Sequence, residues 1–335
     1  MPFRPLSALS SAALLIMGCL PSTLVAQDYT FKFAHILTTD TPAHLAAEFL
    51  AETVAEKSEG KIAIEIFPGG QLGNDTEIVE QIQVGAAHMG IPPTAKLGQF
   101  EPRMQLFDLP YIFPTPEAAY AVLDGEIGSE LLATLEGQGL YGAAYWESGF
   151  KQLTNNVRPI ATPEDLAGIK MRTMSSPLII EQYETWGANP IPIAFAEVYN
   201  ALEQGVAEAQ ENSFVSIDKM KFYEVQKHLT VSNHAYLGYA FIVNKAAWEG
   251  LPTELQEVLQ ASIEEARDYQ RSLNAKLDEE LKAGMAEYGL EIVELEAESI
   301  QAFVEASKPV HEGYVEVIGE DMLNATYDTT AAFVN

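Results

Sequence analysis

Cysteine is nearly absent from this chain, which carries one, Cys19, in 335 residues. Basic side chains are scarce, because 19 Lys and Arg stand against 48 Asp and Glu, for a formal net charge of −29. A single cysteine cannot form an intramolecular disulfide, so the fold must rely on its packed core. Nucleic acid requires a basic surface that neutralises phosphates, so this charge excludes a nucleic-acid partner.

Sequence motifs of the common enzyme classes are also missing. The chain has no GxSxG, P-loop, HExxH or GxGxxG motif. Asp and Glu are too abundant to single out a catalytic pair. The six histidines lie without a metal-ligand spacing, at positions 35, 44, 88, 228, 234 and 311. We therefore predict a protein that is not an enzyme and that needs neither a metal nor a cofactor.

The N-terminus, residues 1–26, is typical of a secretory signal peptide. Arg4 supplies the positive charge, residues 9–16 form a short apolar run, and Ala26 is a small residue at a plausible cleavage point. The run is too short to span a membrane, and no later segment is long enough. The alternative is a lipobox in "LIMGC", with Cys19 as the lipid-anchored N-terminus. Both readings predict an exported protein that works in the periplasm.

The rest of the chain alternates strand-like and helix-like segments, which predicts an α/β fold. Residues 29–36 form the first predicted strand, and residues 42–60 the helix after it. "KIAIEIF" is the second strand, and Asn74 with Glu77 forms a capping box for the next helix. These β-α-β units predict a parallel sheet. Similar units resume near residue 150, and one long amphipathic helix is predicted from Pro252 to Tyr288.

Basic residues are concentrated in residues 151–172, which contain only two acids, Glu164 and Asp165, beside Lys151, Arg158, Lys170 and Arg172. Arg172 is near the end of the predicted strand "IKMRTM", just before a helix start at Ser175–Pro177. Ligands of α/β sheets bind at the carboxyl ends of strands, and a guanidinium can hold both oxygens of a carboxylate. Arg172 is therefore either an anion-binding residue or a structural arginine paired with an acid.

Polar and aromatic residues at other strand ends are further candidates. Asn212 closes the strand "VAEAQEN" and can donate to a carboxylate, although a lone Asn is also common in turns. Trp146, Phe195, Tyr236 and Tyr239 could wall a pocket or belong to the core.

Several segments together resemble the solute-binding proteins of tripartite ATP-independent periplasmic (TRAP) transporters, of the C4-dicarboxylate-binding type. They are "GKIAIEIFPGGQLGNDTEIVEQIQVG", "WESGFKQLTNNVRPIATPEDLAGIKMR", "NPIPIAFAEVYNALEQGVAEAQEN" and "FYEVQKHLTVSNH". The resemblance implies a two-domain periplasmic-binding-protein-like fold with an interdomain ligand cleft, strand hinges and a long helix crossing both domains. It implies a first domain of residues 27–149 plus 237–277 and a second of 150–236 plus 278–335.

The same resemblance implies roles for individual residues. Arg172 would pair with the ligand carboxylate, Asn212 would contact the same ligand, and Phe195 would pack on it. Lys151 stands where relatives commonly have a second Arg. The positive charge is kept, but the planar guanidinium that can bind both oxygens of a carboxylate is lost. Four further residues fall where family members vary with their ligand, and we carry them as candidate contacts: His35, Asp75, Trp146 and Tyr236.

The resemblance thus predicts a monomeric, exported protein that captures a small organic-acid anion and delivers it to TRAP membrane subunits. The anion would be a C4-dicarboxylate, a sugar acid or a related carboxylate; Ile36 and Pro93 disfavour sialate, whose binders have polar residues there. Three alternatives remain open at this point: a ligand sensor for a membrane receptor, an ABC-importer binding protein and a periplasmic enzyme.

Overall fold

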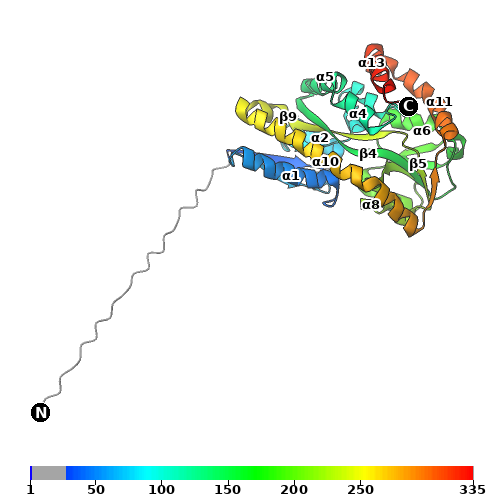
Figure 1. Cartoon of the computed structure of the whole chain (residues 1–335), viewed down its shortest axis with the longest axis horizontal. Helices are drawn as coiled ribbons and strands as arrows, with labels where there is room; N and C mark the ends of the chain where they lie inside the picture. The colour runs from blue at the N-terminus through cyan, green and yellow to red at the C-terminus, as the bar shows by residue number, and fades with distance from the viewer. Residues whose placement is uncertain (2–27, 335) are drawn as a thin grey trace.

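The computed structural model describes residue 1 and residues 28–334, so most of the predicted signal peptide, including Cys19, lies outside the described residues. The fold is α/β, as predicted, with helices packed around two groups of strands (Figure 1). None of the described helices is long and apolar enough to cross a bilayer.

The first group of strands contains the N-terminal β-α-β units. β1 (Tyr29–Ala34) pairs in parallel with β2 (Ile62–Phe67) and with β3 (Met89–Gly90), as the predicted crossovers require. Between these strands lie α1 (Pro42–Lys57), capped by Thr41, and α2 (Asp75–Gln83). β9 (Tyr236–Asn244) then runs antiparallel to β3 and to β4 (Leu140–Asn155), which gives the order β2-β1-β3-β9-β4.

The second group of strands begins on the other half of β4. That half pairs antiparallel with β7 (Ala209–Ser213) and β8 (His228–Val231). β5 (Lys170–Thr173) runs parallel to β7 and to β6 (Asn189–Pro192), and β10 (Glu291–Glu294) runs parallel to β8. The helices of this half are α6 (Pro177–Thr185), α7 (Val198–Glu203) and α8 (Phe214–Lys219).

Two long elements connect the halves. β4 belongs to both groups of strands, and its register shifts between Glu147 and Gly149, where Gly149 has a φ of +96°. α10 (Thr253–Tyr288) is 36 residues long and lies against α1, β4 and α8, so it crosses from one half to the other (Figure 1). Gln270 of this helix hydrogen-bonds the backbone of Glu147 in both directions, which fixes α10 beside the bend in β4.

The remaining helices pack on the two halves, and one of them, α3 (Thr94–Leu97), reaches the cavity described below. The others are α4 (Pro116–Leu123), α5 (Glu126–Thr134), α9 (Lys245–Glu249), α11 (Ala297–Gly313), α12 (Val315–Ile318) and α13 (Glu320–Ala331). α11 packs on α6 of the second half, whereas α13 packs on α4 and α5. α13 therefore lies against the first half, whereas α11 stays with the second, to which the predicted division assigns all of residues 278–335.

Candidate functional site

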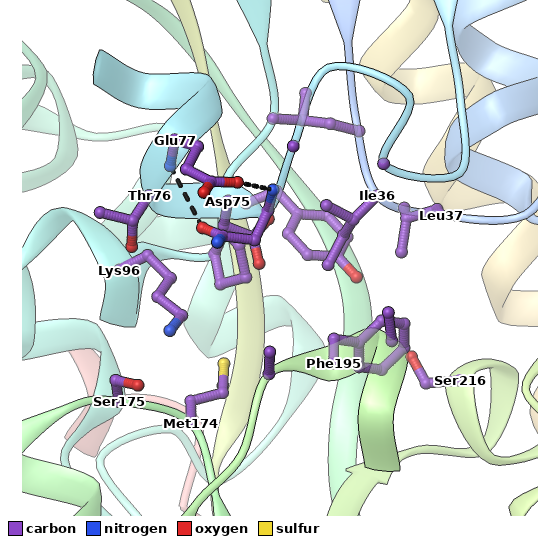
Figure 2. A pocket seen from close by; sticks show the side chains of 18 of the residues that line it. Ile36, Leu37, Asp75, Thr76, Glu77, Lys96, Met174, Ser175, Phe195 and Ser216 are labelled. Carbon is purple, nitrogen blue, oxygen red and sulfur yellow. Dashed lines mark hydrogen bonds between the residues drawn. The ribbon is translucent and has the colours of Figure 1, made fainter. Parts of the chain in front are cut away.

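A cavity of about 490 Å³ lies between the two halves. Its residues follow or end the strands of both halves, so the carboxyl ends of parallel strands meet there, where α/β sheets bind ligands. The first half contributes residues 36–37, 69–70, 73–77, 80, 91, 93 and 96, and the second contributes residues 172, 174–175, 194–196, 212 and 216; Leu237 and Tyr239 come from β9. Figure 2 shows this arrangement from close by.

One wall of the cavity is the glycine-rich turn between β2 and α2. Gly69, Gly70 and Gly73 have φ values of +62°, +72° and +115°, which side chains with a Cβ rarely adopt. Asn74 accepts a hydrogen bond from the Glu77 backbone at 3.2 Å, and Glu77 accepts one from the Asn74 backbone at 2.8 Å (Figure 2). The predicted capping box is thus confirmed.

Asp75, the first residue of α2, carries a buried carboxyl group into this cavity. It is 8% exposed. Burial raises the pKa of Asp75 to about 6, while the positive charges of Lys96 and Arg172 act in the opposite direction. Asp75 is therefore the cavity group whose charge changes near neutral pH.

The opposite wall carries Arg172, at the end of β5. Its side chain is 2% exposed, and Nε and Nη2 both donate to the Ile193 carbonyl oxygen, at 3.0 and 2.8 Å. Burial lowers the pKa of Arg172 to about 10, and Glu211 and Asp75 oppose that shift. No acid of residues 28–334 forms a salt bridge with this guanidinium. The structure therefore does not support the alternative that Arg172 is a structural arginine paired with an acid.

Asn212 and Phe195 join Arg172 on the second half's side of the cavity. Asn212 is 4% exposed, and its amide nitrogen donates to the Gln210 side chain at 2.6 Å. Phe195 is half-buried and meets Phe222 edge to face, with ring centroids 6.0 Å apart. Tertiary structure thus brings four of the eight predicted contacts to one cavity: Asp75, Arg172, Phe195 and Asn212.

Lys96 also lines the cavity, although the sequence reasoning did not select it. It lies on α3 and is half-buried, and it forms no salt bridge with any acid of the described chain. Burial lowers the pKa of Lys96, and Asp75 opposes that shift. A signal was available in the sequence, because Lys96 comes soon after the strand-like stretch "AAHMGI", residues 86–91, which contains β3, and the strand-end argument that selected Arg172 also applies there.

Lys151 does not line the cavity, because its charge is neutralised elsewhere. Its side chain is 1% exposed, and Nζ lies 3.0 Å from Oε1 of Glu211. The other oxygen of Glu211 lies 2.8 Å from His234 Nε2 and accepts from the Tyr183 hydroxyl at 2.9 Å. We call these four residues the Glu211 cluster. The sequence suggested a ligand contact for Lys151, and the structure shows a partner in a buried ion pair instead.

The other three candidates are buried and do not line the cavity. His35 Nε2 lies 3.1 Å from His44 Nδ1, and burial lowers the pKa of His35 to about 3. Trp146 packs in the core against Phe33 and Phe241. The Tyr236 hydroxyl donates to the Glu147 carboxylate, which also accepts a hydrogen bond from Asn274 of α10. For these side chains, position near a strand end did not imply access to the cavity.

The site has the chemistry of an anion-binding site. It combines two cations, an amide and a buried carboxyl group with apolar side chains. Within residues 28–334 no cluster of three or more His, Cys, Asp or Glu side chains is suited to a metal ion. Two α/β halves connected by β4 and α10, with a cavity between them, define the class of two-lobed solute-binding proteins.

Comparison with known proteins gives the family. Residues 33–317 match the model of the bacterial extracellular solute-binding proteins, family 7, and the chain belongs to this family. It is 38% identical over 330 residues to the C4-dicarboxylate-binding periplasmic protein DctP of Rhodobacter capsulatus, covering 98% of both chains. It is 37% identical over 272 residues to the 2,3-diketo-L-gulonate-binding periplasmic protein YiaO of Escherichia coli, covering 81% of this chain and 82% of that one.

Solved structures agree with this assignment. A TRAP periplasmic solute-binding protein of Sulfurospirillum deleyianum with bound succinate is 38% identical and has a TM-score of 0.85, covering 90% of this chain and 99% of that one. A sugar-acid-binding protein of Advenella mimigardefordensis in complex with galactonate is 30% identical, with a TM-score of 0.88 and coverage of 91% and 98%. The predicted family resemblance and two-domain fold are confirmed.

Proposed function

We propose that this protein captures a small organic-acid anion in the periplasm and delivers it to the membrane subunits of a TRAP transporter, without chemical conversion. The observation that carries the proposal is Arg172, a guanidinium that is 2% exposed, lines the cavity and has no acidic partner among residues 28–334. Leaving a charge buried without a counter-ion costs free energy, which a bound carboxylate offsets. Relatives of this chain bind succinate, galactonate and a diketo sugar acid, which supports the same ligand class.

In this proposal Arg172 holds a ligand carboxylate, Asn212 donates to the same ligand, and Phe195 packs on its carbon skeleton. Ligand binding would shift the population toward a pre-existing closed state of the two halves, with β4, which belongs to both groups of strands, as a hinge. Gly149, at the bend of β4, has a backbone conformation that favours glycine and is suited to a hinge.

A thermal-shift screen tests the ligand class. We expect succinate, galactonate or another small organic acid to raise the Tm, whereas succinamide, the neutral diamide of succinate, leaves it unchanged. A ligand at 100 times its Kd stabilises the folded protein by about 2.7 kcal/mol. If only neutral or cationic compounds raise the Tm, the proposal is wrong. Loss of the bound acid to a new product during incubation, followed by chromatography, would instead indicate an enzyme.

A further inference from the structure

The two cations of the cavity come from opposite halves of the molecule, and neither is paired. Lys96 extends from α3 toward Met174 and Ser175 of the other half (Figure 2), while Arg172 ends β5. Both lack a salt bridge to any acid of the described chain, although acids outnumber bases 48 to 19 in the sequence. The cavity therefore offers two positive groups to a ligand, one from each half of the molecule.

Asp75 is the buried acid that faces these two cations. Its electrostatic partners are Lys96 on α3 and Arg172 on β5, and it acts in turn on the hydroxyl of Tyr239 on β9. The other acids of the cavity lining, Glu77 and Glu80, are exposed to solvent. Solvent screens exposed charges and leaves buried ones effective, so Asp75 determines the charge inside the cavity.

The charge of the cavity interior therefore has two values. With Asp75 ionised, Lys96, Arg172 and Asp75 sum to one positive charge, which balances a monoanion. With Asp75 protonated they sum to two, which balances a dianion, and the neutral carboxyl group can donate a hydrogen bond to the ligand. A second negative charge entering a buried site disfavours the carboxylate form of Asp75 and favours its protonated form.

We infer that Asp75 takes up a proton when a dianion such as a dicarboxylate binds with its carboxylates toward Arg172 and Lys96. Monoanions then bind with little or no proton uptake. The inference rests on the proposed function, because it concerns the same organic-acid site. It assigns Lys96 and Asp75 as the residues that set the ligand charge that the site prefers.

The sign of the pH dependence follows from linkage. Burial already raises the pKa of Asp75 to about 6 in the ligand-free protein, and a bound dianion raises it further. Binding of a dianion is then tightest at low pH. It weakens as the pH rises through the pKa of Asp75 in the ligand-free protein and then through its higher pKa in the complex, by about five- to twentyfold between pH 6 and pH 8. Lys96 and Arg172 carry their charge throughout in this account. Burial also raises the pKa of Asp108, to about 7, but Asp108 does not line the cavity, so the effect is assigned to Asp75.

Isothermal titration calorimetry of the wild-type protein provides the first test. Fumarate is suitable because both its carboxyl groups stay ionised in this pH range, and its monoamide is a monoanion of the same length. Each is titrated at pH 7 in buffers with different ionisation enthalpies. We expect fumarate to bind with uptake of about half a proton to one proton, and the monoamide with much less. Fumarate binding without proton uptake would overturn the inference.

Asp75→Asn provides the second test, since asparagine resembles the protonated acid. We expect this variant to bind fumarate without proton uptake and with an affinity that is nearly constant between pH 6 and pH 8. Glu65→Gln, which removes one exposed acid of β2 outside the cavity, is the matched control and should keep the wild-type behaviour. Unchanged proton uptake in Asp75→Asn would assign the titration to another group and overturn the inference.

Lys96→Met separates the inference from the proposed function. We expect it to weaken fumarate binding at least about tenfold and to affect the monoamide much less, because a charge-assisted contact to one carboxylate is lost. Equal losses for the two ligands would overturn the role of Lys96 in reading the second carboxylate. If neither fumarate, its monoamide nor any other organic acid binds the wild-type protein, the proposed function itself fails.

Discussion

The cavity and the Glu211 cluster bury charges in opposite ways. In the cluster, Lys151 and Glu211 are each 1% exposed and lie 3.0 Å apart, and His234 and Tyr183 satisfy the second carboxylate oxygen. In the cavity, Arg172 is equally buried and meets only the carbonyl oxygen of Ile193. Removing either partner of a buried ion pair destabilises the ligand-free fold, because the other charge then stays buried without compensation. A buried charge without an ion-pair partner instead favours binding of a ligand that supplies the counter-charge.

One strand separates the two regions. Glu211 and Asn212 are neighbours on β7, and because side chains alternate along a strand, the first points into the cluster and the second lines the cavity. Lys151, on β4, lies opposite Ser213, and its ammonium group reaches Glu211, two residues away on the same face of β7, so Lys151 belongs to the cluster. The comparison predicts that substitutions in the cluster lower stability and that substitutions in the cavity lower affinity.

The largest expected effect is on stability. Lys151→Ala leaves Glu211 without its cation and should lower the free energy of unfolding by about 3–5 kcal/mol, because an uncompensated charge then stays buried. Urea unfolding, followed by circular dichroism, measures this change. Lys170→Ala, at an exposed position of β5, is the matched control and should change the stability by less than about 0.5 kcal/mol. A Lys151→Ala variant of wild-type stability that has lost ligand binding would place Lys151 among the ligand contacts instead.

The next effect is on affinity. Arg172→Ala should weaken binding of the acid found in the thermal-shift screen by about 3 kcal/mol, since the carboxylate loses a charge-assisted partner in a buried site. The same variant should change the ligand-free unfolding free energy by less than about 1 kcal/mol, because no ion pair is broken. Calorimetry and urea unfolding of one preparation measure both quantities. Wild-type affinity in this variant would contradict the assignment of Arg172.

The smallest expected effect belongs to Asn212. Asn212→Ala should weaken binding by about 1 kcal/mol, the typical contribution of a neutral hydrogen bond, and should leave the stability nearly unchanged. Isothermal titration calorimetry with the same acid measures this change in binding free energy. If this substitution lowers stability as strongly as Lys151→Ala does, then Asn212 belongs with the Glu211 cluster. The two faces of β7 would then not divide into one that stabilises the fold and one that binds the ligand.

Local sequence signals predicted the regular elements well where caps and periodicity were strong. The helix after Thr41, the capping box at Asn74 and the long helix from Pro252 to Tyr288 are present almost as predicted, the last over Thr253–Tyr288. Residues 94–138 received no prediction, and they contain short helices, including α3 with Lys96. A helix of four residues has too little periodicity to be recognised from its sequence.

The site was only partly predictable for a different reason. Strand-end position and family resemblance selected eight residues, of which Asp75, Arg172, Phe195 and Asn212 line the cavity. Lys151 and Arg172 cannot be distinguished locally, because both are basic residues of strands in the same half. Glu211, 60 residues from Lys151 in the chain, is the partner that separates them.

The sequence by itself determined the α/β class, the family and the presence of Arg172 at a strand end, because hydrophobic periodicity, helix caps and turn glycines are local properties. Tertiary structure decided which buried charges are paired. It brought Glu211 to Lys151, left Arg172 and Lys96 without a salt bridge to any acid of residues 28–334, and buried Asp75 in the same cavity as both cations. Pairing and desolvation depend on distances between residues far apart in the chain, and only the folded arrangement of β4, β5, β7 and α3 sets those distances.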